Sequence, residues 1–115
     1  MSDSEKTTPE TQNWRDLIEV LNALLSERLS VTEGCRRVSR LASDLNQRSN
    51  KLFLPFIGVD SETDRFPLGD VRTRWSSAAL VREDEERARV ENHYKSFVAN
   101  ACTALLPYAR TQIRP

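Results

Sequence analysis

Two amphipathic stretches separated by one short turn constrain the fold of this chain more than any other feature. Apolar residues recur at intervals of three and four between Trp14 and Leu25, which predicts a helix that begins at the Thr8-Pro9 cap and ends near Arg28. The sequence "SVTE", residues 30–33, then matches the S-x-x-E capping box that marks the start of a second helix. Because only a residue or two separates the two predicted helices, they must pack as an antiparallel hairpin.

Gly34 lies one turn inside the predicted second helix. Glycine in a helix interior costs about 0.5 to 1 kcal/mol relative to alanine. We therefore expect the neighbouring helix to approach closely at this position.

The rest of the chain predicts two more helices around an irregular segment. The most apolar segment, residues 49–59, contains Pro55 and Gly58, which argue against a regular helix or a central strand and favour an irregular buried crossing. The spacing of Leu68, Val71 and Trp75 then predicts a short middle helix. After a serine cap, an apolar stripe that runs to residue 107 predicts a long C-terminal helix, whose charged first half is typical of a solvated face.

These elements predict an all-α fold, a compact helical bundle formed by residues 8–115 after a disordered tail at residues 1–7. The sequence contains no internal repeat and gives no sign of a second domain. The apolar faces predict a core that includes Trp14, Leu17, Leu21, Leu24, Val38, Leu41, Phe53, Phe56, Trp75, Phe97, Cys102 and Leu105.

The charge balance bears on the possible partners, and the apolar runs and cysteines bear on the cellular compartment. The 17 basic and 17 acidic residues cancel, so no overall field favours a nucleic acid or an anionic membrane. The first residues lack the apolar run of a signal peptide, and no later run approaches the roughly eighteen apolar residues of a membrane span, so we expect a cytoplasmic protein. Cys35 and Cys102 stand alone on apolar faces and are expected to be reduced core residues.

The stretch "DSETD", residues 60–64, is the main candidate for chemistry. Its three acids have the spacing of a calcium loop, but Arg65 replaces the glycine of the sharp turn and Val71 replaces the bidentate glutamate, so calcium is not expected. His93 is the single histidine and the chain has three glycines, too few for a zinc site or a phosphate-binding loop. We therefore expect no cofactor, no metal and no enzymatic activity.

Two interpretations of this stretch remain open. Residues 61–64 fit the S-x-x-D capping pattern, so the polar side chains could simply organise a turn. Alternatively, the acids form a negative edge that binds a basic protein. The candidate partner-binding residues are Asp60, Glu62, Asp64 and Asp70.

Two resemblances bear on function. The run "LNALLSERLSVTEGCRRVSRL" resembles the opening of small bacterial immunity proteins of the colicin D immunity type. The longer pattern, including "FIGVDSETDRFPLGDVRTRW", is similar to short bacterial proteins classed as domains of unknown function. The first resemblance implies a helical bundle that neutralises a nuclease toxin by presenting acids to its cationic active site, a role that would fall on the four candidate residues.

The leading hypothesis is therefore a non-enzymatic protein-binding module, immunity-like or antitoxin-like, whose acidic loop binds a basic partner such as a toxin domain. One alternative is a small accessory protein or homodimer that uses the long C-terminal helix as its interface. A second alternative is a small hydrolase that uses the loop carboxylates.

Overall fold

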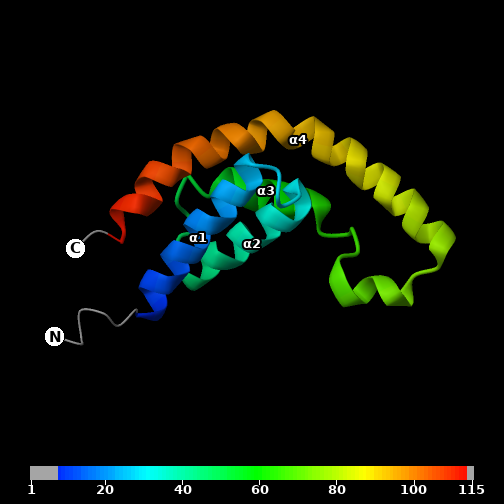
Figure 1. Cartoon of the computed structure of the whole chain (residues 1–115), viewed down its shortest axis with the longest axis horizontal. Helices are drawn as coiled ribbons and strands as arrows, with labels where there is room; N and C mark the ends of the chain where they lie inside the picture. The colour runs from blue at the N-terminus through cyan, green and yellow to red at the C-terminus, as the bar shows by residue number, and fades with distance from the viewer. Residues whose placement is uncertain (1–7, 114–115) are drawn as a thin grey trace.

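The computed structural model describes residues 8–113, and in this part of the chain it contains helices and no strands (Figure 1). The all-α prediction is confirmed, whereas the predicted tail at residues 1–7 lies outside the described residues. The elements in chain order are α1 (Pro9–Leu25), α2 (Val31–Asp44), α3 (Leu54–Thr63), the short 3-10 helix η2 (Gly69–Arg74) and α4 (Ser77–Thr111).

The helical hairpin of α1 and α2 forms where its caps predict it. The Thr8 hydroxyl accepts the backbone N–H of Thr11 at 3.1 Å, and the Ser30 hydroxyl accepts that of Glu33 at 3.2 Å. Helix α1 ends at Leu25, earlier than predicted, because Glu27 adopts a φ of 60° that takes the chain out of the helix.

Gly34 lies against Leu24 of the neighbouring helix, so the predicted close approach is confirmed. A Cβ atom at position 34 would lie 2.2 Å from Leu24 Cδ2, a distance shorter than any normal contact. The two helices can therefore pack this closely because Gly34 has no side chain.

The crossing between α2 and α3 is irregular only as far as the fully buried Phe53, because residues 54–63 form a regular helix. The prediction that Pro55 and Gly58 exclude a helix here is wrong. Pro55 lies in the first turn, where its missing N–H has no helical acceptor to lose, and Gly58 faces open space. The predicted S-x-x-D cap is also wrong, since residues 61–63 lie inside α3 and Asp64 follows its end.

Helix α4 spans the molecule. Its 35 residues extend about 50 Å at 1.5 Å per residue, and the longest dimension of the molecule is 57 Å. In Figure 1 its C-terminal half lies over α1 and α3, while its N-terminal half extends beyond them towards η2. It continues past Pro107 to Thr111, because the carbonyl that loses its N–H partner belongs to the exposed Thr103 and can bind water.

The core lies between α1, α2, α3 and the C-terminal half of α4. Two core predictions are wrong: Trp75 is 38% exposed and Phe97 is 51% exposed. They belong to residues 69–97, which we call the arm and in which no residue is buried. Leu41 is only partly buried. The predicted residues that are buried are Trp14, Leu17, Leu21, Leu24, Val38, Phe53, Phe56, Cys102 and Leu105.

Both cysteines are free and fully buried, as predicted. Burial raises the pKa of the Cys35 thiol to about 12 and that of the Cys102 thiol to about 11. Within residues 8–113, no helix has the length and apolar character needed to cross a membrane.

Candidate functional site

Among the described residues, Asp60 is the one candidate carboxylate with an ion-pair partner. It lies on α3, and its Oδ1 is 3.5 Å from Nε of Arg36 on α2. The same guanidinium donates a hydrogen bond of 2.9 Å to the carbonyl of Thr63 at the end of α3, which also accepts the backbone N–H of Phe66 at 3.1 Å. Arg36 therefore joins α2 to the end of α3, and Asp60 is part of that structural contact.

Glu62 and Asp64 are exposed at the C-terminal end of α3. Within residues 8–113, neither has a basic side chain within ion-pair distance, and no basic residue lies in the last turn of α3. The C-terminus of a helix carries partial negative charge, so carboxylates are disfavoured there by about 0.3 to 1 kcal/mol each. These two charges lie where the helix itself does not stabilise them.

Asp70 lies on a different element, the first turn of η2, and is exposed. Within residues 8–113, no three histidine, cysteine or acidic residues are grouped so that they could hold a metal ion. The four candidate carboxylates thus lie at three places. Asp60 is paired with Arg36, Glu62 and Asp64 are at the end of α3, and Asp70 is on η2.

Glu62 also lines an open hollow of about 450 Å³ between α3 and α4. The other charged groups of this hollow pair with one another, since Arg65 and Arg89 both contact Glu86. The remaining lining residues are Val90, His93 and Tyr94. Among the described residues, Glu62 is therefore the lining carboxylate of this hollow that has no ion-pair partner.

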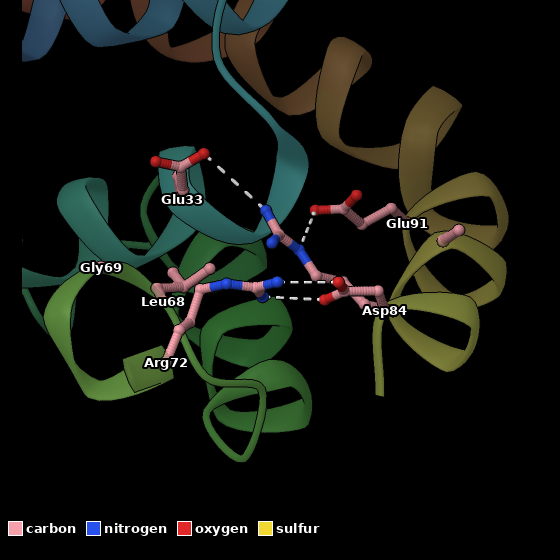
Figure 2. A pocket seen from close by; sticks show the side chains of 8 residues that line it. Glu33, Leu68, Gly69, Arg72, Asp84 and Glu91 are labelled. Atoms are coloured by element: carbon pink, nitrogen blue, oxygen red, sulfur yellow. Dashed lines mark hydrogen bonds and ion pairs between the residues drawn. The ribbon is translucent and has the colours of Figure 1, made fainter. Parts of the chain in front are cut away.

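A second polar cavity, of about 330 Å³, lies between α2, η2 and α4 (Figure 2). Arg72 of η2 forms two parallel hydrogen bonds of 2.8 Å to the two oxygens of Asp84 on α4. This fork-to-fork geometry is the strongest form of an arginine–carboxylate pair. Hydrogen bonding to Arg72 lowers the pKa of Asp84 below its usual value of 3.8.

Arg87 of α4 links the same cavity to the capping box of α2. Its guanidinium donates to the Ser30 hydroxyl at 2.7 Å and to Oε2 of Glu91 at 3.2 Å, and it lies 3.7 Å from Oε1 of Glu33. Glu91 in turn accepts the backbone N–H of Thr32 at 2.9 Å. Two α4 side chains therefore complete the N-terminal cap of a helix that is distant in sequence.

Burial alone would raise the pKa of the Glu91 carboxyl. The hydrogen bond from Thr32 and the charge of Arg87 outweigh burial, so the pKa lies below its usual value of 4.5 and the carboxylate stays ionised.

A family model described as a protein of unknown function, DUF2489, matches residues 2–105, which is most of the chain. The chain belongs to the DUF2489 family. Comparison with curated proteins and with solved structures gives no match. The similarity to domains of unknown function is thus confirmed, while the likeness to colicin D immunity proteins remains a resemblance.

For this member of DUF2489, sequence reasoning missed the network around Arg87 and Glu91, because it treated the charged half of α4 as a solvated face. A signal was available. One face of the helix carries Asp84, Arg87, Glu91 and Val98, at intervals of three, four and seven residues. The three charged side chains therefore lie on the same face as the buried Val98.

Proposed function

We propose that this chain is a non-enzymatic protein-binding module, immunity-like or antitoxin-like, which binds a basic partner such as a toxin domain through the carboxylates at the end of α3. The observation that carries the proposal is the position of Glu62 and Asp64. Both are exposed and without an ion-pair partner among the described residues, at a helix end whose dipole opposes their charge. Charges kept at a cost to the fold are typical of residues retained for binding.

The fixed backbone of α3 also supports the proposal. The stretch "DSETD" forms a helix that Arg36 fastens to α2, so a partner meets carboxylates whose backbone is already ordered. Binding to an ordered surface avoids the entropy loss that a flexible loop would suffer. The proposal is carried by Glu62 and Asp64, since Asp60 is engaged by Arg36 and Asp70 belongs to η2.

The hydrolase alternative has less support. Acid catalysis by two carboxylates needs both groups to face one cleft. In the hollow beside Glu62 the second carboxylate, Glu86, is already paired with two arginines. Such a hollow suits the insertion of a partner's basic side chain beside Tyr94 and Glu62 better than it suits proton transfer.

The experiment first requires the partner. It is isolated by co-purification from native cells and mass spectrometry, and proteins encoded in neighbouring genes are the first candidates because an immunity protein is encoded beside its toxin. Binding is then measured for the double variant Glu62→Gln, Asp64→Asn. We expect affinity to fall by about tenfold or more, with the association rate losing its salt dependence.

The stability of the same variant makes the test sharper. Removing two carboxylates from a helix C-terminus should leave the melting temperature unchanged or slightly higher. Glu10→Gln is the matched control, because it removes an exposed carboxylate from the first turn of α1, where the dipole favours it. That control should lose a little stability and no affinity. A double variant that binds as tightly as the parent chain would refute the proposal.

A further inference from the structure

The first part of the arm, residues 69–97, carries three exposed apolar side chains. Val71 is 46% exposed, Trp75 is 38% exposed and Val81 is 57% exposed. These residues fall within one short stretch that covers η2, the link after it and the first turns of α4, which we call the tip. Figure 1 shows η2 and the start of α4 together at one end of the molecule, away from α1.

The tip has a fixed shape although it lacks a core. Arg72 and Asp84 hold η2 against α4 through two hydrogen bonds of 2.8 Å, and Arg65 reaches Glu83 and Glu86 from the end of α3. A helix of a soluble protein usually gains most of its stability from a packed apolar face. The tip thus presents apolar surface on an ordered scaffold, which lowers the entropy cost of docking.

Charges at the tip are divided into two groups. Arg72 and Asp84 pair with each other, and Glu83 pairs with Arg65. Four exposed charges of the tip have no ion-pair partner within residues 8–113: Asp70, Arg74, Arg82 and Glu85. This set contains one acid and one base from η2 and one acid and one base from α4.

The balance of these charges indicates the occupant. A strongly acidic or strongly basic partner would meet repulsion from two of the four groups. A second copy of the same surface, related by a two-fold axis, can place each acid opposite a base, because every contact in such an interface occurs twice. We propose that the tip is a self-association surface at which two copies of this chain pack their exposed tryptophan and valine side chains together. This surface is separate from the carboxylates at the end of α3.

The strength of the association follows from the size of the tip. Three partly exposed apolar side chains per copy fall below the roughly 800 Å² per partner of a standard stable interface. The dimer should therefore form with a dissociation constant in about the micromolar range, and it should exchange rapidly with monomer.

Sedimentation velocity on the full chain, from about 1 µM to about 0.5 mM, tests the proposal. The average mass should rise from monomer towards dimer. Val81→Glu and Trp75→Glu should each raise the dissociation constant by about tenfold or more. Leu54→Glu is the matched control, since Leu54 is 46% exposed but lies on α3, and it should leave the dissociation constant unchanged. Circular dichroism melts establish that each variant is folded.

A charge exchange adds a second readout. Arg82→Glu and Glu85→Arg should each weaken association, and the double variant should recover part of it because the acid–base balance of the tip is restored. A chain that stays monomeric over the whole range would overturn the proposal, as would a dimer that Val81→Glu does not weaken. A monomer that captures a different protein through Val81 would assign the tip to that protein and would also overturn it. None of these three results affects binding at Glu62 and Asp64.

Discussion

The Glu91 carboxylate accepts the backbone N–H of Thr32 at 2.9 Å, and so joins α4 to the first turn of α2 across 59 positions of sequence. Glu91→Ala should lower the free energy of unfolding by about 1 to 3 kcal/mol, because it leaves a helix N–H unpaired and deprives Arg87 of a partner. Denaturant unfolding followed by circular dichroism measures the loss. Glu85→Ala, on an exposed position of the same helix, should change stability by less than about 0.5 kcal/mol.

Acid should weaken the same contact. The pKa of Glu91 is lower in the folded chain than its usual value of 4.5, so the carboxylate binds protons more readily when the chain unfolds. Its contribution is therefore complete above about pH 4.5 and is lost as the pH falls through the lower folded pKa. Denaturant midpoints measured between about pH 7 and about pH 3 should decline, and the decline should be smaller in Glu91→Gln. An equal decline in both proteins would contradict this role.

Alkali should destabilise the chain through its thiols. Burial raises the pKa of Cys35 to about 12 and that of Cys102 to about 11, from usual values of 9.0, so both thiols stay protonated in the folded state while they ionise in the unfolded state. Stability is complete below about pH 9 and falls as the pH rises towards those values. At neutral pH a thiol reagent should label neither cysteine until denaturant is added. Fast labelling of the native chain would contradict the burial of the thiols.

Adding one methyl group should have opposite effects at two helical glycines. Gly34→Ala forces a Cβ atom to within 2.2 Å of Leu24 Cδ2, and this overpacking should cost about 1 to 3 kcal/mol despite the better helix propensity of alanine. Gly58→Ala is the matched control, because its Cβ would meet no atom within 4 Å. It should stabilise the chain by up to about 1 kcal/mol. Thermal melts of the two variants distinguish these effects directly.

The hairpin could be predicted from sequence because its signals are local. The Ser30 cap, the apolar stripes and the cost of Gly34 each refer to residues within a few turns, and the structure confirms all three. Pro55 is also a local signal, but it led to a wrong prediction. Its effect depends on its position within the helix, and the sequence alone does not place the first turn of α3.

The arm could not be predicted, because its features depend on contacts that are distant in sequence. Helical spacing placed Trp75 and Phe97 in the core, yet spacing reports only which side chains share a face and not whether another element covers that face. The pairing of Arg87 with Ser30 depends on how α4 crosses α2. For the candidate site, sequence identified Glu62 and Asp64 but not that they end a helix.

Helix α4 is one continuous helix, but its two halves are stabilised by different kinds of interaction. Its C-terminal half is held by buried apolar residues such as Val98 and Leu105, and its N-terminal half by the ion pairs of Asp84, Arg87 and Glu91. Salt shortens the reach of charge interactions from about 10 Å at 0.1 M to about 3 Å at 1 M, whereas it does not weaken apolar burial in this way. Added salt should therefore speed amide hydrogen exchange before residue 97 and leave the exchange of later amides unchanged, which places a boundary between two cooperative units inside a single helix.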